Sequence, residues 1–396
     1  MRHRPPDAAA TAALQGLLDV YAGRGNVPGI ALFVGSPRLG IDFTGAAGVA
    51  DRATGAPLRP GTPFRIASNT KTHVAAAMLR LVERGRLTLD TALAGLLPKA
   101  YLTVLRDGGY DPGAMTVRML AWHTSGLRDY AQTEEYFAVV LGDRGRRWTR
   151  LEQVRFAMAL GPPVGMAGER FAYADTGYIL LGQIIEDLSR QPLAAALRSL
   201  LRFDELGLSA TYLESLEEAP PGLGERARIY LGEDDVSTID PSFDLYGGGG
   251  LVAPVADLGR FYQALFAGRV FDRAETLAQM LALAPVEAGF GVGMGLFGQG
   301  WHGFRCWQHT GYWGSLAVAC PEIELTIGLM LFQATVSRES GIGEFSKRLA
   351  DQVRARIGAG AIQRPPSPVL PLPVNRADDR VQPPRAPGTR GRRGGR

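Results

Sequence analysis

A serine and a lysine spaced three residues apart have types that could carry out covalent chemistry. The stretch FRIASNTKTH, residues 64–73, contains Ser68 and Lys71, and Lys71 is one of only three lysines in a chain otherwise rich in arginine. On a helix this spacing places both side chains on one face. A serine hydroxyl needs a base to become a good nucleophile, and a lysine can be that base if its pKa is lowered, whereas an arginine cannot. The pair therefore indicates a lysine required to lose its proton, although an N-capping serine and a surface lysine explain an isolated match better.

Two further stretches carry residues of the same kind. FAYADTGYILLGQIIE contains Tyr173 and Asp175 before a helical pattern, and a tyrosine beside a lysine can relay a proton. WQHTGYWGS contains His309, Thr310 and Gly311 on a predicted strand, where a glycine would let a ligand lie close to the backbone. Taken singly, each has a structural explanation: a helix cap, a packed aromatic ring and a strand histidine.

The elements that must position these residues follow from hydrophobic periodicity. Leu14, Leu17, Leu18 and Tyr21 recur at helical spacing and predict an amphipathic first helix. Residues 29–36 and 40–50 read as a hairpin, and 67–84 as a helix whose apolar stripe includes Ser68 and Lys71, so that both face inward. Strands return after residue 286 and a helix from about 343 to 357 closes the pattern. We expect an α/β (α+β) fold with an antiparallel sheet flanked by terminal helices, plus a mainly helical inserted domain. The predicted limits are 8–72 and 286–357 for the discontinuous sheet domain, 73–285 for the helical domain, and 358–396 for a disordered tail rich in proline and arginine.

The three motifs together resemble those of the serine β-lactamase and penicillin-binding-protein superfamily. The order Ser-Asn-Thr-Lys, Tyr-Ala-Asp, His-Thr-Gly is most similar to the branch of class C β-lactamases, D-Ala-D-Ala carboxypeptidases, D-amino-acid peptidases and β-lactamase-like esterases. The flanking stretches GTPFRIASNTKTHVAAAMLRLVERGRLTLD, MTVRMLAWHTSGLRDY and GGGGLVAPVADLGRF are similar as well. The likeness spans roughly residues 25–350, and it implies the β-lactamase-like fold.

The resemblance also implies roles. Ser68 would form the acyl-enzyme, Lys71 would activate it, and Tyr173 would pass protons to the leaving group and the deacylating water. The backbone N–H groups of Ser68 and Tyr312 would form an oxyanion hole. The implied substrate-binding residues are Asp175, His309, Thr310, Gly311 and Tyr312. HTSGL, which contains His123 and Ser125, is assigned a supporting role, and Gly247–Gly250 a close approach of backbone.

Two positions depart from the family pattern. Asp175 stands where asparagine is usual, and a carboxylate cannot donate the hydrogen bond that an amide offers to a substrate carbonyl. It could instead hold Lys71 or accept from a substrate N–H or ammonium group. His309 stands where β-lactamases tend to have lysine, and a mostly neutral imidazole is a weaker partner for a carboxylate.

We therefore expect a serine hydrolase acting through an acyl-enzyme on small esters or amides, of the esterase or D-amino-acid peptidase type. A D-Ala-D-Ala carboxypeptidase or weak β-lactamase is one alternative. A non-catalytic sensor or assembly protein with the same fold is the other.

Charge and cysteine content narrow the partners. The formal charge of +4 comes from the tail, because eight arginines against two aspartates from Arg364 onward leave the rest of the chain slightly acidic. No nucleic-acid or membrane partner is expected for the folded body, no cofactor or metal is implied, and the expected location is the cytoplasm. The pattern favours buried thiols for Cys306 and Cys320, but a hairpin near Tyr312 and Trp313 would bring them face to face, so an oxidised pair stays open.

Overall fold

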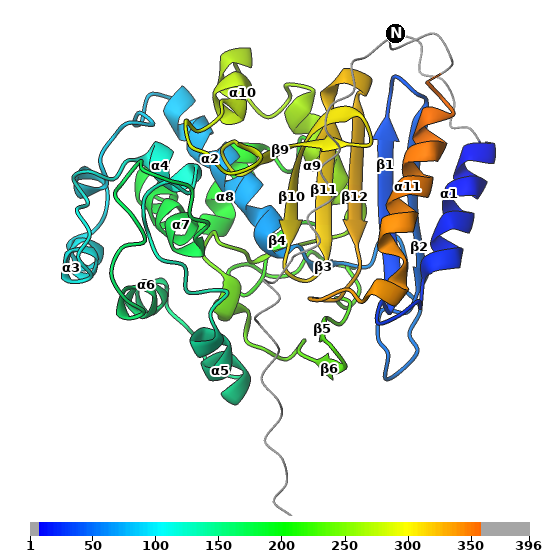
Figure 1. The fold of residues 1–396 in the computed structure, drawn as a ribbon, viewed down its shortest axis with the longest axis horizontal. Coiled ribbons are helices and arrows are strands. Elements are labelled where there is room, and N and C mark those ends of the chain that lie inside the picture. Colours follow the sequence, from blue (N-terminus) through cyan, green and yellow to red (C-terminus); the bar gives the residue numbers. More distant parts are fainter. Residues whose placement is uncertain (1–7, 358–396) are drawn as a thin grey trace, which may run out of the picture.

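A seven-stranded antiparallel sheet and a group of helices beside it make up the computed structural model, which describes residues 8–357 (Figure 1). The strand order is β2-β1-β12-β11-β10-β9-β8, so the two ends of the chain meet in one sheet. Its strands are β1 (Gly29–Ser36), β2 (Ile41–Gly48), β8 (Gly291–Val292), β9 (Phe297–Trp301), β10 (Phe304–Gly311), β11 (Ser315–Cys320) and β12 (Leu325–Met330). Short pairings elsewhere involve β3 (Phe64–Arg65), β4 (Tyr212–Leu213), β5 (Tyr230–Leu231), β6 (Asp234–Asp235) and β7 (Leu251–Ala253).

Eleven α-helices lie within the described residues. They are α1 (Ala8–Tyr21), α2 (Thr70–Glu83), α3 (Lys99–Asp107), α4 (Val117–Ala121), α5 (Glu134–Gly142), α6 (Arg150–Ala159), α7 (Asp175–Ser189), α8 (Leu193–Leu201), α9 (Val255–Phe266), α10 (Ala274–Leu281) and α11 (Ile342–Arg354). None of these helices combines the length and the apolar character needed to cross a membrane. The predicted disorder of residues 358–396 concerns a part of the chain outside the described residues.

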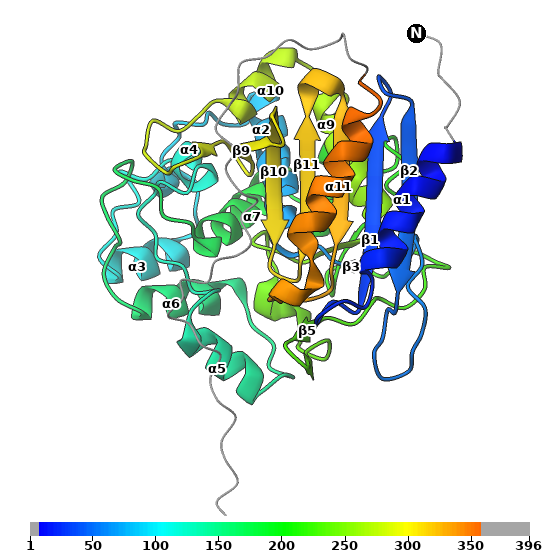
Figure 2. The ribbon, with the colours of Figure 1, turned by 45° about the vertical axis from the view of Figure 1, so that its right-hand side comes forward.

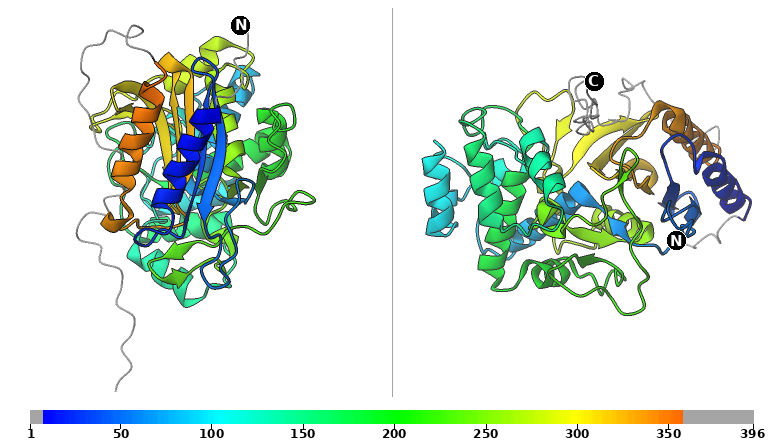
Figure 3. Two further views of the ribbon diagram at one scale, coloured as in Figure 1. Left: turned by 90° about the vertical axis from the view of Figure 1, so that its right-hand side faces the viewer. Right: turned by 90° about the horizontal axis from the view of Figure 1, so that it is seen from below.

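Both faces of the sheet are covered by helices, as alternation along β1 requires. Ile30, Leu32 and Val34 join the core formed with α1 and α11, whereas Ala31 and Phe33 join the core on the opposite face. Figure 2 shows α1 and α11 side by side on one face of the sheet and α9 behind the sheet, and Figure 3 shows α1 (blue) and α11 (orange) together on the same side. The predicted helices at both termini and the predicted antiparallel sheet are thus present.

Helix α9 packs on the sheet although it belongs to the middle of the chain. It contacts β1, β11 and β12. A side chain at Gly259 would collide with the ring of Phe33, so the bare helix surface lets the two elements approach closely. The division into a domain of residues 8–72 and 286–357 and a domain of residues 73–285 remains a prediction.

Helix α2 is the central helix and carries the lysine of interest. A 3-10 turn over Ala67–Asn69 leads into it, and every residue from Thr70 to Leu81 is buried. A helix buried on all sides must be surrounded by other elements, and α7, α8 and α10 contact it. Gly85, with φ of 67°, follows the last turn of the helix and allows the chain to leave it.

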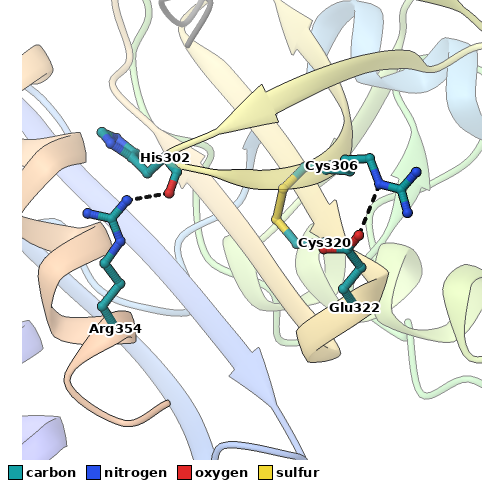
Figure 4. Close-up of a disulfide and its surroundings, with 6 residues drawn as sticks. His302, Cys306, Cys320, Glu322 and Arg354 are labelled. Carbon is teal, nitrogen blue, oxygen red and sulfur yellow. Dashed lines mark hydrogen bonds and ion pairs between the residues drawn. A yellow bond between two sulfur atoms is a disulfide. The ribbon is translucent and has the colours of Figure 1, made fainter. Parts of the chain in front are cut away.

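The two cysteines are bonded to each other, which makes the preference for buried thiols wrong and the open alternative correct. Trp307 pairs with Ala319 across the β10–β11 hairpin, so Cys306 lies opposite Cys320, with 4.2 Å between their Cα atoms. Figure 4 shows the disulfide near Glu322. Oε1 of Glu322 accepts a 3.0 Å hydrogen bond from Nε of Arg305. In the same view the Arg354 side chain donates to the carbonyl of His302. The disulfide therefore ties the two strands together three residues before His309.

Candidate active site

Ser68 and Lys71 form a hydrogen-bonded pair at the start of α2. The Lys71 Nζ atom lies 2.9 Å from Ser68 Oγ and donates a second bond of 2.6 Å to the carbonyl of Gly248. Lys71 is 0% exposed, whereas Ser68 is only half-buried among fully buried neighbours. The residue before the serine, Ala67, has φ of 47°, a left-handed conformation that non-glycine residues adopt at some cost. The pair thus combines a half-buried serine with a fully buried lysine.

The turn that holds Ser68 is fixed to the sheet by buried polar contacts. Asn69 Nδ2 donates to Ser315 Oγ at 2.9 Å, and Ser315 Oγ donates to the carbonyl of Ile66 at 2.7 Å. A Cβ at Gly311 would collide with Ile66 O and Ser315 Oγ. Gly311 was expected to make room for a ligand, but it makes room for the backbone of this turn.

Tyr173 lies over the lysine and against a histidine. Lys71 Nζ is 5.1 Å from the centre of the Tyr173 ring. His123 stacks on that ring with 4.3 Å between centroids, and its Nδ1 accepts a 3.2 Å hydrogen bond from the N–H of Ala174. The HTSGL stretch therefore supports the Tyr-Ala-Asp motif directly, through its histidine.

Asp175 forms an ion pair with Lys71, one of the two roles left open for this departure from the family pattern. The carboxylate is almost fully buried, and it approaches Nζ through Oδ1. Asp175 is also the first residue of α7, and its N–H donates to Oδ1 of Asp129 at 2.9 Å. The negative charge at this position is therefore directed at the lysine.

Two more carboxylates, those of Asp129 and Asp244, surround this ion pair, and the sequence did not identify either of them. Burial, followed by the charge of Asp175, raises the pKa of each from 3.8 to about 7. The glycine run makes room for two of the carboxylates, because a Cβ at Gly248 would lie 3.3 Å from Asp175 atoms and one at Gly249 would collide with Asp244. Asp129 follows HTSGL and Asp244 precedes the glycine run, but no spacing rule connects them with Lys71.

The three strand residues of the third motif lie at the end of β10. His309 is buried, its Nδ1 donates to the carbonyl of Thr310 at 2.7 Å, and its Nε2 finds no partner within residues 8–357. Thr310 is half-buried. Tyr312 follows the strand, with its ring stacked on Phe137 at 5.4 Å between centroids.

Known proteins resemble the chain over most of its length. The family model described as Beta-lactamase matches residues 13–344. The chain belongs to this family. Esterase EstB of Burkholderia gladioli is 29% identical over 359 residues, which cover 80% of this chain and 88% of the esterase.

Two solved structures of amide hydrolases are similar to this family member. A D-stereospecific amidohydrolase from Streptomyces sp. is 28% identical with a TM-score of 0.71, covering 86% of this chain and 99% of that chain. The D-amino acid amidase from Ochrobactrum anthropi SV3 complexed with D-phenylalanine is 25% identical with a TM-score of 0.73, covering 88% and 99%. The predicted membership of the β-lactamase superfamily, the β-lactamase-like fold and the class of serine hydrolase are confirmed.

The charge state of Lys71 differs from the neutral amine that the sequence predicted. Burial is the largest single effect and lowers the pKa of Lys71, but the interactions with Asp175, Tyr173 and Asp244 together outweigh it, so the pKa is raised overall. The lysine of the resting site is therefore protonated, whereas the spacing of Ser68 and Lys71 predicted a neutral amine.

The aromatic groups beside this pair are neutral. Burial raises the pKa of Tyr173, although the charge of Lys71 opposes the rise, so the phenol keeps its proton. Burial, followed by the charge of Lys71, lowers the pKa of His309 to about 3 and the pKa of His123 well below its ordinary value. The expected neutral His309 agrees with this direction. Among the residues that the structure places, no group of three or more His, Cys, Asp or Glu side chains is arranged to hold a metal ion.

Proposed function

We propose that the protein hydrolyses small esters or amides through an acyl-enzyme on Ser68. The observation that carries the proposal is the 2.9 Å contact between Lys71 Nζ and Ser68 Oγ, in which the lysine is fully buried and the serine is only half-buried. A serine adjacent to a buried amine at hydrogen-bond distance has the arrangement that nucleophilic catalysis needs. The similarity to Esterase EstB and to two amide hydrolases supports esters or amides as the substrate class.

The acylation step begins from the minor, neutral form of Lys71. Its Nζ takes the proton of Ser68 Oγ as Oγ bonds to the substrate carbonyl carbon. The tetrahedral oxyanion accepts hydrogen bonds from the N–H groups of Ser68 and Tyr312, which the packing of Gly311 against the serine turn supports. Losing one such donor typically costs about 3 kcal/mol of transition-state stabilisation.

Departure of the leaving group and release of the acyl group complete the cycle. The neutral phenol of Tyr173 donates its proton to the leaving oxygen or nitrogen, and Lys71 restores that proton to the phenol. Water then attacks the acyl carbonyl, gives its proton to the same groups, and Ser68 Oγ leaves with a proton. The raised pKa of Tyr173 supports its role as a proton donor at neutral pH.

A neutral His309 favours esters and amides over substrates that present a carboxylate near the third motif. Burial and Lys71 keep this imidazole uncharged, so it offers no positive charge to a β-lactam or to a terminal carboxylate. Carboxypeptidase and β-lactamase activities are accordingly secondary proposals. The intact contact between Ser68 and Lys71 disfavours a non-catalytic sensor.

The disulfide bears on the cellular location of the protein. A cytoplasmic location was expected, yet disulfides are rare in that compartment. The Cys306–Cys320 bond therefore counts against it.

A panel of p-nitrophenyl esters and amino-acid amides tests the proposal, with wild type and Ser68→Ala compared. We expect turnover by the wild type and a loss of at least ~1000-fold in Ser68→Ala, with nearly unchanged thermal unfolding. The proposal would be wrong if the wild type hydrolysed none of these esters and amides, or if Ser68→Ala hydrolysed them as fast as the wild type.

A further inference from the structure

Three phenylalanines form a continuous surface beside the candidate site, which we call the aromatic wall: Phe171, Phe290 and Phe297. Phe290 contacts Phe297 at 5.3 Å and Phe171 at 5.5 Å between ring centroids, and Phe171 lies 6.1 Å from Phe297. All three contacts are edge-to-face, the geometry that aromatic pairs prefer. The rings come from the segments before α7 and β8 and from the first residue of β9.

The aromatic wall is continuous with the reactive groups. Phe297 lies 5.1 Å from the His309 ring and 6.4 Å from the Tyr173 ring, and Phe171 lies 6.0 Å from His123. A substrate acylating Ser68 must lie next to Tyr173 if this tyrosine protonates the leaving group. Its remaining atoms can then extend along Phe297 towards Phe290.

Exposure argues that the aromatic wall is not part of the protein core. Phe290 is 40% exposed, and Phe171 and Phe297 are each partly exposed. None of the three rings is a member of either hydrophobic core within residues 8–357. A contiguous aromatic surface that stays exposed to water beside a reactive site is a surface on which an apolar ligand can bind.

The surroundings of the aromatic wall also disfavour a charged ligand. The histidines that it contacts are both neutral, because burial lowers the pKa of His123 and of His309. The carboxylates Asp175 and Asp244 interact with Lys71 instead. Apolar rather than ionic contacts are therefore available to a substrate here.

We propose that the aromatic wall binds an apolar alkyl or aryl group of the ester or amide substrate, with Phe290 as the outermost specificity-determining residue. The inference rests on the proposed hydrolase function and adds a substrate class to it: acyl or leaving groups with several carbon atoms or a ring. Each additional methylene that packs on Phe290 and Phe297 leaves water and stabilises the bound substrate.

Two ester series test this, and each isolates one side of the scissile bond. The first varies the acyl chain of p-nitrophenyl esters from acetate to hexanoate, and the second varies the alcohol of acetate esters from methyl to hexyl. In at least one series we expect kcat/KM of the wild type to rise by about tenfold or more with chain length. In Phe290→Ala that rise shrinks to about threefold or less, mainly through KM, and Phe290→Leu is intermediate.

Val20→Ala is the matched control, because Val20 is 42% exposed on α1, which covers the far edge of the sheet. It should reproduce the wild-type ratio of long-chain to short-chain hydrolysis, and thermal melts of all variants check folding. Turnover without any chain-length dependence, or an equal dependence in wild type and Phe290→Ala, would overturn the substrate-binding role of the aromatic wall and leave the proposed hydrolase function intact. Absence of turnover that depends on Ser68 would instead overturn the hydrolase function.

Discussion

Two regions meet at Ser68, and they differ in charge. On one side Lys71 contacts Asp175, the carboxylate of Asp244 also raises the pKa of Lys71, and the carboxylate of Asp129 accepts a hydrogen bond from the N–H of Asp175. On the other side lie rings without charge, from Tyr173 to the aromatic wall.

This difference in charge means that the two sides control hydrolysis of the substrate's scissile bond in different ways. Buried charges stabilise one another, so a change on the charged side alters protonation and hence the rate of proton transfer. Neutral rings act by contact and shape, so a change on the aromatic side alters fit and hence the choice of substrate. Substitutions should therefore divide into those that change the pH dependence of kcat and those that change KM or the preference among substrates.

The largest effect is expected on the charged side, from Lys71→Arg. The guanidinium keeps its proton at any working pH and cannot accept one from Ser68. We expect kcat for p-nitrophenyl butyrate to fall by at least ~1000-fold, within the range that a general base contributes. Lys347→Arg, an exposed position on α11, is the control and should retain full activity. Turnover of Lys71→Arg within tenfold of wild type would contradict the role of this amine.

Asp175→Asn should move the pH dependence of hydrolysis. Asp175 raises the pKa of Lys71 and burial lowers it, so removing the carboxylate leaves burial dominant and the pKa falls. Wild-type kcat/KM should rise with pH into the alkaline range, and in the variant this rise should occur about 1–3 pH units lower. Asp187→Asn at the other end of α7 is the control. Superimposable profiles for wild type and Asp175→Asn would show that the ion pair does not set the proton affinity of Lys71.

Asp244→Asn should alter stability as a function of pH. The folded pKa of Asp244 is raised from 3.8 to about 7, so the folded state holds a proton that the unfolded state releases. The stabilisation is present below pH 3.8 and is lost as pH rises through about 7. Between pH 5 and 8 the melting temperature of wild type should therefore fall by several degrees more than that of Asp244→Asn, at about 2–4 °C per kcal/mol.

The control for this comparison is Asp42→Asn, an exposed carboxylate on β2. It should follow the wild-type curve. A parallel decline in Asp244→Asn and wild type would mean that this carboxylate does not titrate in that interval.

The smallest effect is expected on the aromatic side, from His123→Phe. The new ring can stack on Tyr173, but it cannot accept the hydrogen bond from Ala174 N–H. Loss of one buried hydrogen bond typically costs about 1–3 kcal/mol of stability. We expect a drop in kcat/KM of about tenfold or less, mainly through KM, with an unchanged pH profile. A shifted profile would contradict the separation of the two sides, since His123 carries no charge.

Local patterns were enough to predict several parts of the structure. The β-branched and aromatic run of β1 and the apolar stripe of α1 depend on neighbours in sequence, and both elements are present. The contact between Ser68 and Lys71 also spans one turn of helix, so the spacing predicted that both lie on one face, and the other two motifs were needed to favour a catalytic pair. The resemblance to a known family supplied the relation of these residues to Tyr173 and His309.

Contacts between distant segments could not be predicted in the same way. Asp244 reaches the site from a 3-10 turn far from α2, and its approach depends on the bare surface of Gly249. Because Asp175 approaches the lysine only in the folded chain, the sequence suggested a neutral Lys71 where the structure has a charged one. The pairing of Cys306 with Cys320 likewise depends on strand register, which composition does not determine.

The most direct measurement of the central claim is the rate and position of covalent labelling by a fluorophosphonate, followed by intact and peptide mass spectrometry. Wild type should gain one adduct that maps to Ser68, Ser68→Ala should gain none, and Lys71→Arg should label at least ~100-fold more slowly. An adduct on another residue, or equal labelling rates in wild type and Lys71→Arg, would contradict the assignment of Ser68 as a nucleophile activated by Lys71.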